Sequence, residues 1–308
     1  MRTIDVQAEG ALFDLTTMLV VSGAFFIAGT VKGVIGLGLP LVSLALLTIA
    51  LDLQTAMALL IVPSCVTNLW QAVVGGNAKV IVNRLWPFLL TATVTVWIGV
   101  AVLTRVNPSL LAGLLGAQLV IYSVVSLRGM RLTVPIRHER WAGALIGSAN
   151  GVLTGMTGSS VVPGVMFLQA IDLPRDELIQ AMGILFTAST LALALALQQA
   201  NLLTVEHGIL SSAAVLPAIA GMMGGQGIRK RLTEQRFRTV FFVALLILGL
   251  YIIANSIRML PAREHVEEEA EPRELARDVR HMNVLSDQCN RLSHGSGVSH
   301  YLGQGRTS

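Results

Sequence analysis

The stretch "GTVKGVIGLGLPLV", residues 29–42, interrupts a long apolar run with four glycines, one proline and one lysine. Glycine and proline both destabilise the interior of a helix. Within a membrane, backbone groups released from a helix find no water, so irregular backbone persists only where protein buries it or where it lines a watery cavity. The interruption therefore predicts either a specialised contact or a cavity at this point of the chain.

The surrounding chain has the composition of a membrane protein. Of its 308 residues, 53% are hydrophobic and 13% are charged, against roughly 25% charged residues in an average soluble domain. A helix needs about 20 apolar residues to cross the hydrocarbon core of a bilayer. Nine runs of about this length contain no Asp, Glu, Lys or Arg: 15–31, 33–51, 53–78, 85–104, 106–127, 141–171, 178–205, 208–228 and 239–257. The sequence predicts an all-α polytopic membrane protein embedded in the lipid bilayer.

Ten apolar segments can be delimited within these runs. They are 15–32, 38–51, 53–74, 85–104, 107–127, 141–156, 160–171, 177–199, 208–228 and 238–257. The segments 38–51 and 160–171 are too short for an ordinary crossing. A change of composition after Pro261 predicts a polar, mostly disordered tail. The expected organisation is an N-terminal segment, a first membrane repeat, a basic loop, a second membrane repeat and the tail: 1–14, 15–127, 128–140, 141–257 and 258–308.

The interrupted stretch occurs twice. Gly29, Gly33 and Gly36 have the spacing G-x3-G-x2-G, and "GVLTGMTGSSVVPG" at 151–164 repeats this spacing, with a proline shortly after it in both places. An internal duplication of this kind is a common way of building a secondary transporter. We therefore expect two inverted repeats, each with a broken or re-entrant pair of short helices plus three transmembrane helices.

The distribution of basic residues predicts the orientation. Lys and Arg are enriched in cytoplasmic loops, and the loops 128–140 and 229–238 hold four and five of them. The loops near Asp52, Arg105 and Glu206 are poor in basic residues and should face outward. This arrangement inverts the two halves relative to each other and places both termini outside.

The repeated break predicts a binding site for an anion. A helix that begins inside the membrane presents unpaired N–H groups and the positive end of its dipole, and such ends bind anions. We expect the two breaks to face one shared site. The candidate backbone residues are Gly33, Gly36, Gly38, Gly155 and Gly158. The alternative is close helix packing through small residues, which is also the role expected of Gly29.

Polar side chains within the apolar runs complete the candidate site. Lys32 is flanked on both sides by long uncharged runs and could supply countercharge to an anion, or it could extend to the membrane interface as an anchor. Asn68 and Gln71 could line the site or form interhelical hydrogen bonds. The substrate-binding side chains proposed from sequence are Lys32, Ser64, Asn68, Gln71, Thr157, Ser159, Ser160 and Thr187.

Several other functions find no support in the sequence. The membrane segments contain no His/Asp/Glu cluster for a metal or for catalysis, and there is no phosphate-binding loop. No basic stripe carries interleaved aromatic residues, which argues against nucleic acid as a partner. We expect no cofactor, no metal and no enzymatic activity.

Two segments together resemble a known family. "KGVIGLGLPLVSLALL" with "AMALLIVPSCVTNLWQ" in the first half, and "GVLTGMTGSSVVPGVMFLQAIDLPRDEL" in the second, are similar to the TauE/SafE family of sulfite and organosulfur-anion exporters. The resemblance covers about residues 15–257. It implies a permease of the bacterial inner membrane that moves sulfite, sulfonates or related small anions, driven by a coupling proton or the membrane potential. A homodimer is a further expectation. The alternative is a non-transporting membrane component that serves assembly or interaction.

Overall fold

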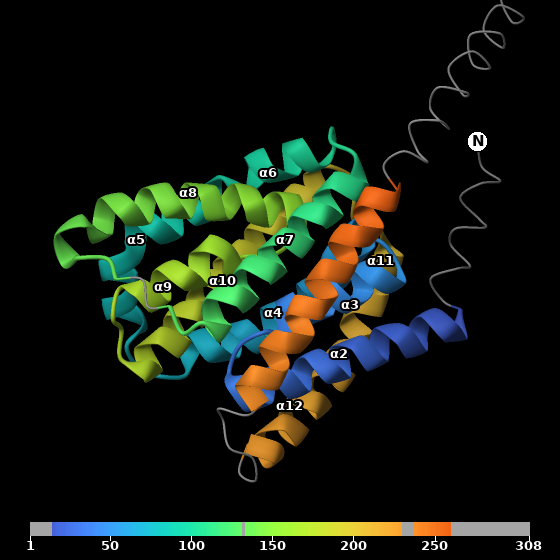
Figure 1. The fold of residues 1–308 in the computed structure, drawn as a ribbon, viewed down its shortest axis with the longest axis horizontal. Coiled ribbons are helices and arrows are strands. Elements are labelled where there is room, and N and C mark those ends of the chain that lie inside the picture. The colour runs from blue at the N-terminus through green and yellow to red at the C-terminus, as the bar shows by residue number, and fades with distance from the viewer. Residues whose placement is uncertain (1–13, 131–132, 230–236, 260–308) are drawn as a thin grey trace, which may run out of the picture. The chain divides into compact units, whose positions relative to one another are not determined.

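The computed structural model describes residues 14–130, 133–229 and 237–259. The expected N-terminal segment 1–14 and the tail 258–308 therefore lie, except for a few residues, outside the described part of the chain. Within that part every regular element is a helix (Figure 1). The predicted all-α class is confirmed.

The first half contains six helices. These are α2 (Leu15–Ile35), α3 (Leu39–Ala50), α4 (Leu53–Val73), α5 (Ala78–Val94), α6 (Val96–Leu103) and α7 (Pro108–Leu127). A connection with a short 3-10 turn, η1 (Ile136–His138), leads to the second half. That half contains α8 (Glu139–Thr157), η2 (Val161–Val165), α9 (Met166–Ala170), α10 (Arg175–Gln199), α11 (Val205–Ala213), α12 (Val215–Arg229) and a last helix, Phe237–Met259.

Local sequence explains where these helices begin and end. Asp52 precedes α4, and its carboxylate accepts a hydrogen bond from the backbone N–H of Thr55 at 2.9 Å, which caps the helix. Gly36 ends α2 and Gly158 ends α8, each with a left-handed backbone (φ 87° and 75°) that glycine adopts without steric cost. The two breaks predicted from the repeated spacing are therefore real helix ends with the same cap geometry.

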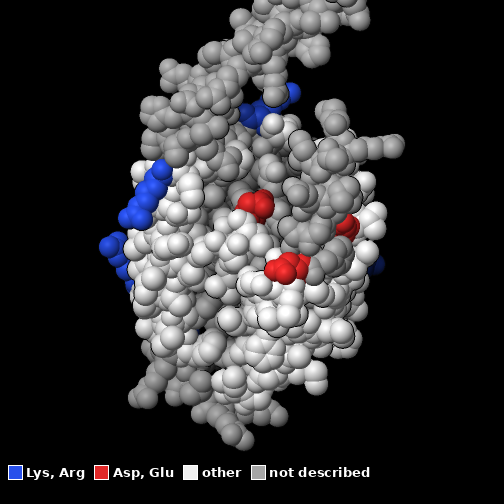
Figure 2. All heavy atoms as spheres, turned by 90° about the vertical axis from the view of Figure 1, so that its right-hand side faces the viewer, with Lys and Arg blue, Asp and Glu red and all other residues white. Residues whose placement is uncertain are grey.

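The helices have the dimensions and surface of membrane spans. Seven described stretches are long and apolar enough to cross a membrane, namely Leu15–Ile35, Leu53–Val73, Ala78–Leu103, Pro108–Leu127, Arg175–Gln199, Val205–Arg229 and Phe237–Met259. Large apolar side chains lie on the outer surface, for example Leu19 at 65% and Leu216 at 75% exposure. Figure 2 shows a face whose described atoms are mostly uncharged. Exposed apolar surface on this scale is stable in contact with lipid rather than water, and the chain is a multi-pass membrane protein.

Glycines set the contacts between the first helix of each half and a helix of the other half. A Cβ added at Gly29 would lie 2.1 Å from the carbonyl oxygen of Ala218, and one at Gly33 would lie 2.2 Å from that of Met222. The backbones of α2 and α12 are therefore in direct contact. The two helices run parallel, because a step of four residues along α2, from Gly29 to Gly33, matches a step of four residues along α12, from Ala218 to Met222. A Cβ at Gly155 would likewise lie 2.2 Å from the Val96 carbonyl oxygen, so that α8 packs on α5 and α6. These contacts follow the small-residue packing of membrane helices.

The remaining long helices pair across the two halves. α4 packs against α10, where a Cβ at Gly183 would lie 2.6 Å from the backbone nitrogen of Ala72. α7 packs antiparallel on the last helix, with Gly116 against Gly249. The short helices α3 and α9 each follow one of the two breaks and are largely buried among these pairs. The two polar centres described next lie where the breaks meet α4 and α7.

Candidate functional site

Lys32 is the centre of the first group of polar residues. It lies one turn before the end of α2, and only 5% of its surface is exposed. Its Nζ donates a hydrogen bond to Thr67 Oγ1 at 3.1 Å and another to Asn68 Oδ1. No ion pair involving Lys32 occurs among the described residues. Lys32 is therefore a buried amine whose hydrogen-bond partners on α4 are neutral.

The helix that carries the partners of Lys32, α4, contains an internal proline at position 63. Pro63 has no N–H, which leaves the Leu59 carbonyl without its helical partner. Ser211 of α11 fills this position, donating to Leu59 O at 2.7 Å and accepting from Val62 N at 3.1 Å. The helix therefore continues through Pro63 and carries Thr67 and Asn68 to Lys32.

The other residues proposed on α4 have different surroundings. Ser64 is fully buried, and its hydroxyl has no hydrogen-bond partner; the amide nitrogen of Asn68 also has none. Gln71 instead donates to the Ile179 carbonyl of α10 at 2.8 Å, which is the interhelical bond considered above as its alternative role. Ser64 and Asn68 thus lie one turn apart on the face of α4 that Lys32 contacts.

The break of the second half forms a second, uncharged polar centre. Thr154 occupies the position that Lys32 has in the repeated spacing, and its Oγ1 lies 2.9 Å from Ser160 Oγ. Thr157 Oγ1 lies 3.4 Å from Gln118 Oε1 and accepts from the backbone N–H of Ser159 at 3.3 Å. These contacts join the end of α8 to α7.

The two centres are separated along α4. A Cβ at Gly158 would lie 2.8 Å from Met57 Cγ, whereas Lys32 contacts Asn68, eleven residues further along the same helix. At 1.5 Å per residue this is about 16 Å. The expectation that both breaks face one shared site is therefore corrected for this structure. The reason is that α2 and α8, with 21 and 19 residues, are each nearly as long as a bilayer core is thick, so that their ends lie towards opposite ends of α4.

Three further sequence-based proposals have defined places in the structure. Gly33 and Gly155 lie inside helices at backbone contacts, so the structure gives them the packing role and not a place on a broken stretch. Gly38 precedes α3 with φ 109° and lies beside Phe241. Thr187 is half-buried, and its hydroxyl bonds to the Gly183 carbonyl within α10.

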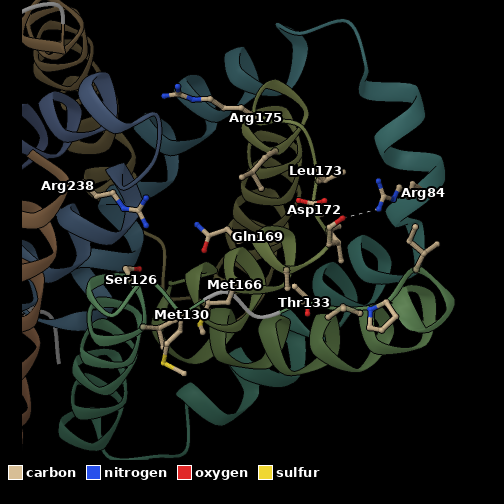
Figure 3. Close-up of a pocket in the computed structure, with 18 residues that line it drawn as sticks. Arg84, Ser126, Met130, Thr133, Met166, Gln169, Asp172, Leu173, Arg175 and Arg238 are labelled. Carbon is tan, nitrogen blue, oxygen red and sulfur yellow. Dashed lines mark hydrogen bonds between the residues drawn. The ribbon is translucent and has the colours of Figure 1, made fainter. Parts of the chain in front are cut away.

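A cavity that the sequence did not predict lies beside the second half. Its volume is about 1120 Å³. Its wall includes three arginines from three helices, Arg84 of α5, Arg175 of α10 and Arg238 of the last helix, together with polar residues such as Gln169. In Figure 3, Arg238 and Gln169 extend toward each other across this space. None of the residues proposed from sequence lines it.

The arginines of this cavity differ in their partners. Arg84 binds both carboxylate oxygens of the buried Glu139, at 2.8 and 2.9 Å, and also the Ile171 carbonyl at 3.1 Å. This bidentate pair holds the start of α8 against α5. Arg238 lies over the ring of Phe242, 5.7 Å from its centroid. Because Arg84 is paired with Glu139 and Asp172 also lines the wall, the cavity is lined by charged groups of both signs.

Sequence reasoning missed these residues for identifiable reasons. The predicted segments placed Arg84 in a loop and Arg238 at a helix end, where orientation alone explains arginine, whereas Arg84 in fact lies within α5. Gln118 and Asn150 are single amides in apolar helices with no spacing that connects them. Only the fold brings Gln118 to the end of α8 and Asn150 to η2, where its Oδ1 accepts from Gly164 N at 2.9 Å.

Comparison with known proteins identifies the relatives of this chain. A family model described as "Sulfite exporter TauE/SafE" matches residues 21–252, which is more than half of the chain. A comparison with curated proteins and one with solved structures gave no significant match. The matched region contains both breaks and both polar centres.

Proposed function

Because the chain belongs to the TauE/SafE sulfite exporter family, we propose that it is a secondary transporter that carries sulfite, sulfonates or related organosulfur anions across the bacterial inner membrane. A proton or the membrane potential would drive the transport. In the described part of the chain, no group of three or more His, Cys, Asp or Glu side chains could hold a metal ion, and the proposal requires none.

The observation that carries the proposal is the burial of Lys32 with neutral partners. An ammonium group in low-dielectric surroundings is costly unless an opposite charge compensates it. Thr67 and Asn68 satisfy hydrogen bonds of Lys32 but bring no negative charge. A small anion bound beside Lys32 would supply that charge, and the unpartnered Ser64 hydroxyl and Asn68 amide nitrogen could donate to its oxygens.

We further propose that the two halves are inverted repeats. The support is an exchange of packing partners between the halves. The first helix of the first half, α2, packs on α12, and the first helix of the second half, α8, packs on α5 and α6. The long helices that follow the short ones, α4 and α10, pair with each other, and so do α7 and the last helix. A two-fold pseudosymmetry would produce this pattern, and transporters built from inverted repeats alternate access by moving one part against the other.

The test is uptake by purified protein in proteoliposomes. Labelled sulfite, methanesulfonate, sulfate and small carboxylates would be supplied with and without an imposed pH gradient. We expect saturable uptake of at least one sulfur oxyanion and little of the carboxylates. If no anion is carried in either direction under any gradient, the transporter proposal is wrong, and a role in membrane assembly or interaction would replace it.

A further inference from the structure

The uncharged centre at the second break contains buried hydrogen-bond donors without acceptors. Gln118, Asn150 and Ser159 each have 3% or less of their surface exposed. Gln118 Nε2, Asn150 Nδ2 and Ser159 Oγ have no hydrogen-bond partner. Buried polar atoms without partners are rare, and a cluster of them calls for a ligand or for ordered water.

The contacts around these atoms fix which groups remain open. Asn150 Oδ1 accepts from the backbone N–H of Gly164, so the amide can only turn its NH₂ group toward the open position. Gln118 Oε1 accepts from the Thr157 hydroxyl at 3.4 Å, which leaves the Nε2 end of the amide without a partner. The backbone N–H of Ser159 donates a hydrogen bond to Thr157 Oγ1, the same hydroxyl that contacts Gln118. The open groups of Gln118 and Ser159 therefore belong to one centre that Thr157 holds together, whereas Asn150 lies seven residues before Thr157 on α8, about 10 Å along the helix, against Gly164.

A line of polar side chains connects this centre to the arginine-lined cavity. Gln118, Tyr122 and Ser126 follow at i, i+4 and i+8 and share one face of α7. Ser126 lines the cavity. Tyr122 is 1% exposed, and its hydroxyl faces Gln169 of the cavity wall without a hydrogen bond of normal geometry. Polar groups thus lie on one face of α7 between the cavity and the second break.

We propose that Gln118 and Ser159 bind the oxyanion head group of the transported substrate at a second site, on the polar face of α7 that extends to the cavity. The inference rests on the proposed transport function and adds a site to it. Amide N–H and hydroxyl groups suit the three oxygens of a sulfite or sulfonate head group, since they donate hydrogen bonds without adding charge. The site lies about 16 Å along α4 from the Lys32 centre, so that the substrate would meet the neutral donors and the cation in succession.

Ordered water is the competing explanation, and it makes a different prediction. Ser159→Ala and Gln118→Met each remove an open donor while keeping a side chain of similar length. If the donors bind substrate, each variant should raise the KM for methanesulfonate by roughly tenfold. For Ser159→Ala the melting temperature in detergent should stay the same or rise, because Ser159 Oγ has no partner in the protein. The matched control is Ser123→Ala, whose buried hydroxyl bonds to Leu119 O at 2.7 Å within α7 and should leave the KM unchanged.

The outcomes separate this inference from the transport proposal. If wild-type protein carries methanesulfonate and Lys32→Met weakens its uptake, but Ser159→Ala and Gln118→Met keep the wild-type KM, the second site is wrong and water fills it. The same conclusion follows if both variants raise the KM only together with a fall in melting temperature, since a general loss of structure then explains the effect. If wild-type protein carries no anion, the transport proposal itself fails.

Discussion

Replacing Lys32 with methionine tests the charge on which the proposed function rests. Methionine keeps an unbranched stem in the space that Lys32 fills and removes the ammonium group. An anion 4 Å from a cation gains up to about 4 kcal/mol at an effective dielectric constant near 20, before the cost of desolvation is subtracted. A hydrogen bond to a charged group retains about 1.5–3 kcal/mol of this after desolvation. We therefore expect Lys32→Met to raise the KM for a sulfur oxyanion about ten- to hundredfold.

The stability of the variant should change little. Thr67 keeps its hydrogen bond to the Pro63 carbonyl at 2.8 Å. Asn68 Oδ1 loses the hydrogen bond from Lys32, but the variant also no longer buries a charge, and the second effect offsets the first in the free energy of unfolding. The assay is concentration-dependent uptake in proteoliposomes together with thermal unfolding in detergent. Lys79→Met is the matched control, because Lys79 is exposed at the start of α5. Unchanged KM in Lys32→Met, with the protein folded and inserted, would refute the countercharge role of Lys32.

Three further predictions concern packing and orientation. Gly29→Ala should lower the melting temperature strongly, because its Cβ would lie 2.1 Å from a backbone oxygen of α12. The control is Gly23→Ala on the same helix, whose Cβ meets nothing within 4 Å and which should keep the wild-type melting temperature. Equal melting curves for the two variants would contradict the α2–α12 contact. Gly158→Ala should lower the free energy of unfolding by about 1–2 kcal/mol because of its left-handed backbone, and contact of the new Cβ with α4 should lower it further. Thermal unfolding measures this change, and an unchanged or raised melting temperature would argue against the cap geometry. Arg137→Cys and His207→Cys, in a background without the native cysteines, should react with an impermeant reagent from opposite sides of the membrane, and labelling from one side would reject the inverted orientation.

The sequence was sufficient for the helices and for the two breaks. Charge-free runs predicted most helices to within a few residues, because the bilayer imposes a minimum length on every crossing, but α5 begins at Ala78, seven residues before the predicted start at residue 85. The repeated glycine spacing predicted the two breaks, which the structure shows as left-handed caps at Gly36 and Gly158. The short segments after both breaks were also correct, as α3 and the stretch Val161–Ala170 show.

The same glycine pattern was insufficient to separate caps from contacts. Gly29 was expected to pack against another helix, but the sequence did not indicate that this helix is α12, which lies far along the chain. A spacing records which face of a helix is small but not which distant helix approaches it. For the same reason the sequence could not indicate that three arginines from different helices meet at one cavity, or that Gln118 faces the break after α8.

The exchange of packing partners also bears on how the protein is made. A chain inserted into the membrane from its N-terminus presents the glycine face of α2 long before α12 is synthesised, and α5 and α6 likewise precede α8. The first half must therefore persist in the bilayer with its closest helix contacts unmade, protected only by lipid, until the second half arrives to complete them. Neither half forms these contacts by itself. The contact of α2 with α12, and that of α7 with the last helix, can therefore form only after most of the chain has been inserted.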